Sequence, residues 1–407
     1  MLGNVAKRLK SSEEQSAVAV HVPSYEEVRC QLTRHRTVRC TPIPDPLNLP
    51  DTLRTTLRGR SVAEGDVNWN EPFLMYTGQG GRMYVLCAKT ELAVLHDSKY
   101  LVCDGTFEMS PDTAYQVYTV HGFCNGEGMA LLWALLPNKS TATYVELFTA
   151  IRSALVSQFG DVGHKTFLVD FKLAAINAIQ QTFPESVVKG CSFHFRQALM
   201  RRIQSLGLKS VYESDEYPEV RRWFRLIMSM TMLPAFAIPM AWSCLSNPPF
   251  AGDSDVDGKT RTFAVYVGAT WITGDYPPTL WSHFDNLGPR TTNLTEGWHN
   301  GINSRFGMPH PSLRCFLDWL QKCQFEVQFR GIQLLAGRPP KQKLPVYQKV
   351  NEELAAAKLR YNMNSSSVFV HVFPSENAWP IFYQMTIDYL SHISHLVGAC
   401  MTCCLVN

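Results

Sequence analysis

Three short apolar runs separated by polar turns begin the regularly patterned part of the chain. The runs are Tyr100–Cys103, Ala114–Phe123 and Met129–Leu136. Runs of this length rich in Tyr, Val and Thr predict strands, and Asn125-Gly126 between the last two is a strong hairpin signal. Because the connections are too short for crossovers, we expect an antiparallel meander.

The spacing of apolar residues then becomes helical. The first helical stripe consists of Tyr144, Leu147, Phe148, Ile151 and Leu155. Such spacing predicts one buried helix face, with Thr141 or Thr143 as its N-cap. The elements expected next are a strand over Lys165–Val169, a helix over Leu173–Phe183, a strand over Val187–Cys191 and a helix carrying Phe195, Leu199, Ile203 and Leu206 that closes at Gly207.

The resulting order, β-β-β-α-β-α-β-α, predicts an α/β fold with a mixed five-stranded sheet flanked by helices. This is the order of the RNase H-like fold. The expected organisation is a flexible basic segment over 1–45, a lead-in over 46–98, a first core part over 99–211, a helical insertion over 212–288, final core helices over 289–336 and an extension of uncertain structure over 337–407.

Composition narrows the class of protein only slightly. The net charge of the 407 residues is +3, so overall basicity does not argue for nucleic acid, whereas a hydrophobic content of 45% allows a sizeable core. No stretch is long and apolar enough to span a bilayer, so we expect no membrane association.

Two aspartates each stand at the carboxyl end of an apolar run that is predicted to be a strand. Asp104 ends the first predicted strand and Asp170 ends the fourth. Functional sites of open α/β sheets are built at the carboxyl ends of strands. Glu296, near the start of the helix predicted over Asn293–Phe306, is the best third acid. From spacing alone each acid is more often a turn or cap residue than a ligand.

Three clustered acids would imply a cation. Without one they would repel one another and raise each other's pKa. Mg²⁺ prefers carboxylate oxygens, and two divalent ions can supply the charge stabilisation and in-line geometry of phosphoryl transfer.

Several sequence blocks together resemble the Mutator-like element (MULE) transposase domain, a family of the RNase H-like DDE transposase superfamily. The blocks occur in the order of the family and are Asp104–Phe107, Leu168–Phe171 followed by Ala174–Ala178, Cys191–His194 and Asn293–Asn300. The resemblance covers roughly Pro46 to Tyr347. Together such blocks are specific, whereas each alone is weak.

The resemblance implies an RNase H-like fold with a helical insertion before Glu296. It also implies strand cleavage and joining at transposon ends that depends on two Mg²⁺ or Mn²⁺ ions, with Asp104, Asp170 and Glu296 as catalytic and metal-binding residues. The expected partners are the terminal repeats, target DNA and further copies of the chain, and the expected location is the nucleus.

Supporting roles fall to four residues: Cys191, His194, Asn293 and His299. Asn293 is the expected N-cap of its helix, and His299 shares a polar stripe with Glu296. The resemblance implies that His194 lies near the DNA phosphate. A structural zinc site needs about four ligands, and Cys191 and His194 lack a second pair, so we do not expect zinc.

The expected DNA contacts are Arg196, Arg201, Arg202 and Lys172. Clustered cations can neutralise phosphates, although a solvated basic face is an equally good interpretation. Lys172 stands where the family often has an acid and Thr292 where it often has Asn, so Lys172 could weaken metal binding or contact phosphate.

Three functions remain open at this point. An active transposase is favoured by the intact acidic triad. A domesticated, non-catalytic DNA- or chromatin-binding protein is favoured by the absence of a recognisable zinc finger among His21, Cys30, His35 and Cys40 and by the unfamiliar sequence after Asn364. A structure-specific nuclease is the third.

Overall fold

The computed structural model describes residues 43, 45, 47–66, 68–306, 310–342, 345–371 and 384–396. The predicted segment 1–45 lies almost entirely outside this range, as does much of the sequence after Asn364. The chain forms two compact units, Met1–Val188 with Thr292–Lys341 and Lys189–Thr291 with Gln342–Asn407. The sequence of the first unit is thus interrupted by most of the second, and the boundaries expected at 212 and 288 remain predictions.

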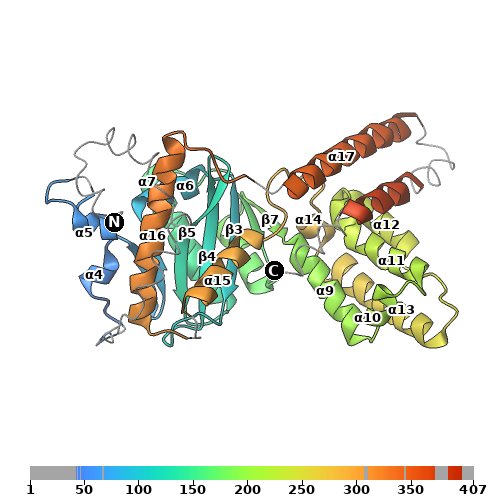
Figure 1. The fold of residues 1–407 in the computed structure, drawn as a ribbon, viewed down its shortest axis with the longest axis horizontal. Helices are drawn as coiled ribbons and strands as arrows, with labels where there is room; N and C mark the ends of the chain where they lie inside the picture. The colour runs from blue at the N-terminus through green and yellow to red at the C-terminus, as the bar shows by residue number, and fades with distance from the viewer. Residues whose placement is uncertain are drawn as a thin grey trace. The chain divides into compact units, whose positions relative to one another are not determined.

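A mixed sheet forms the centre of the first unit (Figure 1). Its strands are β1 (Leu74–Thr77), β2 (Tyr84–Leu86), β3 (Tyr100–Thr106), β4 (Gln116–Cys124), β5 (Glu127–Leu136), β6 (Thr166–Val169) and β7 (Val187–Gly190), in the order β1-β2-β5-β4-β3-β6-β7. The antiparallel meander β3-β4-β5 is confirmed, and β6 pairs with β3 in parallel. The prediction of five strands was wrong because β1 and β2 extend the sheet beyond β5.

The β4–β5 hairpin follows from its turn residues. Asn125 has a φ of 47° and Gly126 a φ of 83°. Two successive positive φ angles match the twist of the flanking strands and favour Asn-Gly. The hairpin closes between Cys124 and Glu127.

Helices cover the sheet of the first unit (Figure 1). They are α4 (Asp51–Arg54), α5 (Leu57–Ser61), the 3₁₀ turn η2 (Gln79–Gly81), α6 (Lys89–Asp97), α7 (Thr141–Phe159), α8 (Leu173–Thr182), α15 (Asn293–Phe306) and α16 (Leu313–Leu335). The predicted apolar stripe of α7 is buried. Its N-cap is Ser140, whose hydroxyl accepts from the Thr143 amide at 3.2 Å, so neither expected threonine is the cap.

Aromatic side chains join α7 to one face of the sheet. Tyr118 of β4 lies 5.2 Å from Tyr144 and 6.2 Å from Phe148, measured between ring centroids. Phe148 in turn contacts Phe167 of β6. Offset and edge-to-face pairs of this kind add to the burial of apolar area.

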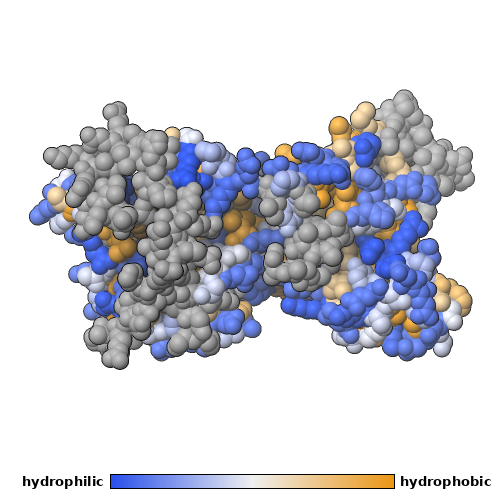
Figure 2. All heavy atoms as spheres, viewed as in Figure 1, coloured by the Kyte–Doolittle hydropathy of each residue, from blue (hydrophilic) through white to orange (hydrophobic). Residues whose placement is uncertain are grey.

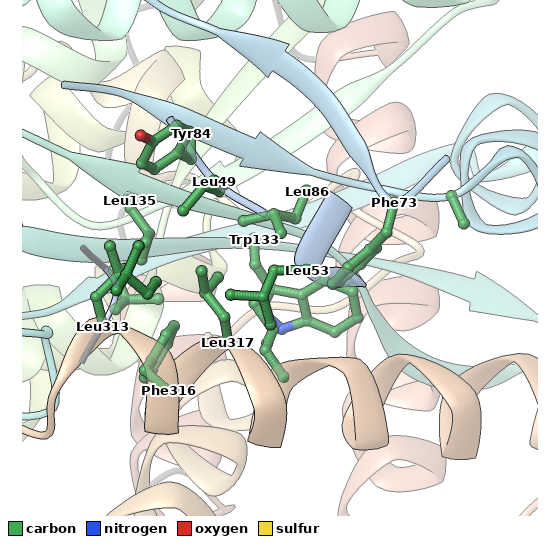
Figure 3. Packing of buried hydrophobic residues seen from close by; sticks show 14 of the residues in the cluster. Leu49, Leu53, Phe73, Tyr84, Leu86, Trp133, Leu135, Leu313, Phe316 and Leu317 are labelled. Atoms are coloured by element: carbon green, nitrogen blue, oxygen red, sulfur yellow. The ribbon is translucent and has the colours of Figure 1, made fainter. Parts of the chain in front are cut away.

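The opposite face packs against α16 (Figure 3). The cluster contains Leu86, Trp133 and Leu135 from the sheet and Phe316 and Leu317 from α16. Trp133 faces Leu86 across the ladder, so alternate residues of β2 and β5 reach the same helix.

A buried polar seam runs between α16 and α6. Gln324, fully buried, donates to Glu91 at 3.0 Å, and Gln328 donates to Thr90 at 3.2 Å. Burial raises the pKa of Glu91 to about 7. The buried polar side chain of Gln324 thus has a specific partner on α6.

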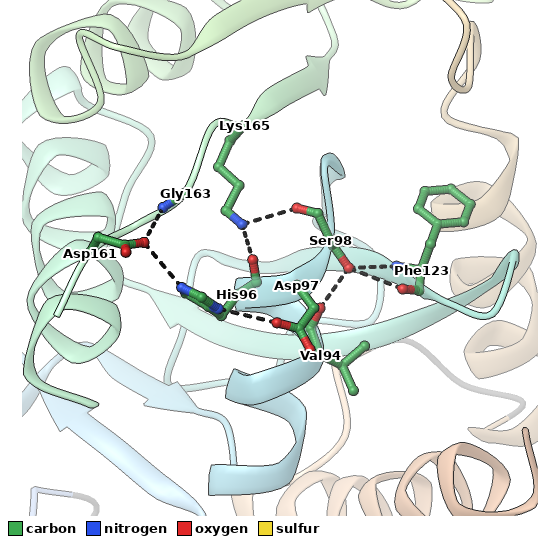
Figure 4. A network of polar contacts seen from close by, with 8 residues as sticks. All are labelled: Val94, His96, Asp97, Ser98, Phe123, Asp161, Gly163 and Lys165. Atoms are coloured by element: carbon green, nitrogen blue, oxygen red, sulfur yellow. Dashed lines mark hydrogen bonds and ion pairs between the residues drawn. The ribbon is translucent and has the colours of Figure 1, made fainter. Parts of the chain in front are cut away.

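A second polar network secures the end of α6 to the start of β6 (Figure 4). The Lys165 ammonium donates to the carbonyls of His96 and Ser98, and His96 bridges Asp97 and Asp161 at 3.2 Å each. A cation at a helix C-terminus complements the free carbonyls and the helix dipole. This network lies where β3 and β6 begin, at the edge opposite to the carboxyl ends of these strands.

The second unit is helical after β7. It contains α9 (Ser192–Ser205), α10 (Lys209–Glu213), α11 (Pro218–Ser229), η3 (Met230–Met232), η4 (Ala235–Ala237), α12 (Ile238–Leu245), α13 (Ser254–Val267), the π-helical η5 (Gly268–Ile272), α14 (Pro278–Trp281), α17 (Pro345–His371) and a helical stretch over 384–396. Phe195 of α9 stacks on Trp281 at 4.8 Å and meets Trp271 edge-on at 4.7 Å, forming an aromatic core.

The visible surface is mainly hydrophilic, with smaller hydrophobic patches (Figure 2). Within the part of the chain that the structure describes, no helix combines the length and apolar character needed to cross a membrane.

Replacing Glu91 by Gln tests the buried seam. A carboxyl with a raised folded-state pKa contributes stability that is present below its unfolded pKa and is lost as the pH rises through the folded value. Glu91→Gln should therefore stabilise the protein at pH 8 by on the order of 2 kcal/mol. The gain should shrink as the pH falls from 7 toward 4.5, as measured by urea unfolding.

Glu64→Gln, at an exposed position of the same unit, is the matched control and should leave stability unchanged at both pH values. A pH-independent effect of Glu91→Gln would show that the Glu91 carboxylate is not destabilised by burial.

Candidate active site

Parallel pairing of β3 with β6 places the two aspartates next to each other. Val102 pairs with Leu168 in this ladder. Asp104 and Asp170 each stand two residues further along, so they share a level and a face of the sheet. Asp104 lies inside β3, which continues to Thr106, whereas Asp170 directly follows β6.

Asp104 carries an unfavourable buried charge. It is 8% exposed. Burial, followed by the nearby charge of Asp170, raises the pKa of Asp104 to about 7, against the partial relief that Lys172 and the Gly105 amide provide. That amide donates to Asp104 Oδ1 at 2.8 Å. The pair thus has the crowded negative charge that a cation would relieve.

Lys172 supplies positive charge at this place. Its ammonium lies 2.8 Å from Asp170 Oδ2, and its amide donates to Asp170 Oδ1 at 3.2 Å. Burial opposes the charged ammonium, but attraction to Asp170 outweighs it and raises the pKa of Lys172. In this structure the Asp170 carboxylate is therefore paired with an internal cation.

Helix α15 brings Glu296 near the two aspartates. A Cβ at Gly128 of β5 would lie only 2.3 Å from Leu294, so the glycine allows α15 to approach the sheet closely. The negative charge of Glu296 is among the causes that raise the pKa of Asp104. Glu296 Oε1 lies 3.3 Å from the hydroxyl of Thr292, the residue before the helix. Asn293 is the first residue of α15 and not its N-cap.

Two histidines are buried where α15 meets the sheet: His299 of α15, which was expected, and His121 of β4, which was not. His299 Nε2 lies 3.5 Å from Thr119 Oγ1, and its Nδ1 lies 3.9 Å from Asp104, too far for a hydrogen bond. Burial and then Lys172 lower the pKa of His299 to about 4, so it is neutral and forms no ion pair at physiological pH. His121 is also neutral, and its ring meets Trp298 edge-on. The alternation in β4 from Thr119 to His121 was the available sequence signal.

The donor chemistry fits a divalent cation, but no three-ligand centre is formed. Asp104, Asp170 and Glu296 offer the carboxylate oxygens that Mg²⁺ and Mn²⁺ prefer. Over the described ranges, however, no three His, Cys, Asp or Glu side chains are grouped closely enough to hold a metal ion. The crowded Asp104–Asp170 pair is the part of the expected centre that the structure brings together.

The remaining expected residues belong to the second unit. Cys191 is the buried N-cap residue of α9, and His194 is partly buried in its first turn. Arg201 is exposed, and the Arg202 guanidinium lies 5.5 Å from the ring centroid of Tyr266. Arg196 is only 6% exposed, so the structure does not support it as a surface phosphate contact.

The segment that contains both aspartates is similar to a known protein family. Residues 100–198 match the family model of the MULE transposase domain. The matched segment contains both aspartates and ends before Glu296. The match indicates a transposase-related function for this segment, and a domain of this kind implies interaction with DNA. Searches of curated proteins and of solved structures give no match.

Replacing Asp104 by Asn tests the crowding of the two carboxylates. In metal-free buffer at pH 7.5, Asp104→Asn should raise the free energy of unfolding by on the order of 2 kcal/mol, because it removes a buried charge that lies next to the Asp170 carboxylate. Millimolar Mn²⁺ should stabilise the wild type more than the variant and so reduce or reverse this difference, as followed by thermal unfolding.

Asp112→Asn, at an exposed position in the loop after β3, should behave like the wild type with and without Mn²⁺. Equal Mn²⁺ stabilisation of wild type and Asp104→Asn would exclude Asp104 as a ligand.

Proposed function

We propose that the chain is the catalytic part of a DNA transposase, which cleaves DNA at transposon ends and joins the cut strands to target DNA. Asp104, Asp170 and Glu296 hold two Mg²⁺ or Mn²⁺ ions in this proposal. The observation that carries it is the adjacency of Asp104, in β3, and Asp170, directly after the parallel strand β6, inside the segment that matches the MULE transposase domain.

The order of elements supports an RNase H-like core. Strands β3 to β7 and helices α7, α8 and α9 follow one another as β-β-β-α-β-α-β-α. In this interpretation β1 and β2 are additions at one edge of the sheet, and residues 212–288 are a helical insertion before the helix of Glu296.

The residues around the proposed metal site have different roles in this proposal. Bound divalent ions supply electrostatic stabilisation of the phosphoryl transfer. Asp104 and Asp170 supply oxygen ligands from two paired strands, which limits their movement. Lys172 neutralises Asp170 when no ion is bound. His299 stays uncharged beside Asp104, so it does not compete with a cation for that carboxylate.

A domesticated, non-catalytic DNA- or chromatin-binding protein is the second candidate. It is favoured by the ion pair between Lys172 and Asp170 and by the lack of a closed three-acid centre among the described residues. In that case the acidic pair would be a neutralised remnant, and DNA binding alone would remain.

The partners of the proposed enzyme are transposon terminal repeats, target DNA and further copies of the chain, and its proposed location is the nucleus. Arg201 and Arg202 are proposed phosphate contacts of the second unit. Contacts of this kind make the affinity fall steeply with salt.

Nicking of labelled DNA tests the catalytic proposal. The wild type with Mg²⁺ or Mn²⁺ should nick a DNA carrying transposon ends, and Asp104→Asn, Asp170→Asn and Glu296→Gln should each lower the rate by at least about 100-fold, because each removes a charged ligand. Cleavage is followed on sequencing gels.

Asp112→Asn serves as the active control. Joining of the cut 3′ end to a second DNA distinguishes a transposase from a structure-specific nuclease. Absence of metal-dependent nicking in the wild type, together with intact DNA binding, would instead establish the non-catalytic candidate.

A further inference from the structure

Two exposed aromatic rings lie beside the acidic pair. Phe107 follows β3 directly and is 37% exposed, and Tyr115 precedes β4 and is 46% exposed. Their ring centroids are 5.4 Å apart, and the rings meet edge-to-face. Each of the two residues keeps more than a third of its surface exposed, so the pair offers aromatic surface to a ligand.

Two lysines flank this pair. The Lys172 ammonium lies 5.2 Å from the Phe107 ring centroid and 2.8 Å from Asp170, so it connects the aromatic pair to the acidic pair. The Lys139 ammonium lies 6.0 Å from the ring centroid of Tyr115. We call Phe107, Tyr115, Lys139 and Lys172 the aromatic ledge.

The loop between β3 and β4 holds the ledge in place. The Ser110 amide donates to the Phe107 carbonyl at 3.2 Å, and the fully buried Ser110 hydroxyl donates to Ala114 at 2.8 Å. The Tyr115 amide donates to Leu136 at the end of β5. These bonds fix the backbone on both sides of the rings before any ligand binds.

The charges around the aromatic ledge favour stacking of a base on its rings over general electrostatic attraction of DNA. Glu108 and Asp112 are exposed on the same loop, so its two acids offset the two lysines. A duplex, whose base faces are covered by neighbouring base pairs, would gain little here. An unpaired base offers a free π-face to an aromatic side chain, and such stacking is tolerant of sequence.

We propose that the aromatic ledge binds an unpaired nucleotide of single-stranded DNA, with its base stacked on Phe107 or Tyr115 and its phosphate beside Lys172 or Lys139. The inference rests on the proposed function, because it places this nucleotide next to the phosphate that the acidic pair would act on. It assigns the protein a preference for DNA that is unpaired beside the reaction site.

Binding measured without metal tests the ledge apart from catalysis. Fluorescence anisotropy in EDTA compares a 20-nucleotide oligo(dT) strand with a blunt duplex of 20 base pairs. The double variant Phe107→Leu/Tyr115→Leu should bind the single strand about tenfold more weakly, the value of roughly one stacked base. Its affinity for the duplex should change less than about twofold.

Two further variants separate stacking from charge and folding. Phe107→Tyr/Tyr115→Phe keeps both rings and should retain wild-type affinity. Lys139→Gln should lower the slope of log affinity against log salt for the single strand by about 0.7, the value of one phosphate contact. The leucine variant should leave this slope unchanged.

Trp69→Leu removes a comparably exposed aromatic ring, 44% exposed, from the turn after α5 and should not affect binding. The proposal is overturned if the wild type does not bind the single strand, if the leucine variant binds it normally, or if that variant loses single strand and duplex equally.

Failure of the ledge and failure of the proposed enzyme give different results. If the wild type nicks DNA in the presence of metal and the leucine variant binds the single strand normally, only the proposed role of the aromatic ledge is rejected. If that variant selectively loses single-strand binding and the wild type does not nick DNA, the proposed role of the aromatic ledge stands and the catalytic proposal is rejected.

Discussion

The parallel ladder between β3 and β6 is the constraint on which the candidate site depends. It places two carboxylates side by side at one level of the sheet, and burial makes the charge of Asp104 unfavourable. Two features offset this charge: the ammonium of Lys172 and the amide of Gly105. A divalent cation would relieve the same repulsion more completely than one ammonium does.

Much of the core could be predicted because its elements are long enough to show a period. The apolar stripe on α7 has helical spacing and Asn125-Gly126 has the residues of a hairpin turn, and in both cases the tertiary structure agrees with this local preference. Strands β1 and β2 could not be recognised in the same way. Tyr84–Leu86 is fully buried and only three residues long, so it presents neither alternation nor turn chemistry of its own.

The two aspartates of the candidate site could be predicted from the sequence, but the contacts that their side chains make could not. Placement at the ends of apolar runs was enough to select Asp104 and Asp170. The ion pair of Lys172 depends on a side-chain direction that spacing does not specify. Arg196 stands three residues before Leu199 and seven before Ile203, on the buried face of α9, so its predicted phosphate contact has no support from its exposure and stays a prediction.

The interruption of the first unit has a consequence for the newly made polypeptide. The strands that carry Asp104 and Asp170 leave the ribosome long before α15 and α16, which follow only after residue 291. Until then Trp133 and Leu135 lack the helix that later covers them, leaving an apolar sheet face open to chaperones and to aggregation. A product that ends between Lys189 and Thr291 would keep both aspartates but lack Glu296 and the covering helices α15 and α16. Such a fragment would have no assembled site and would expose an apolar, aggregation-prone sheet face.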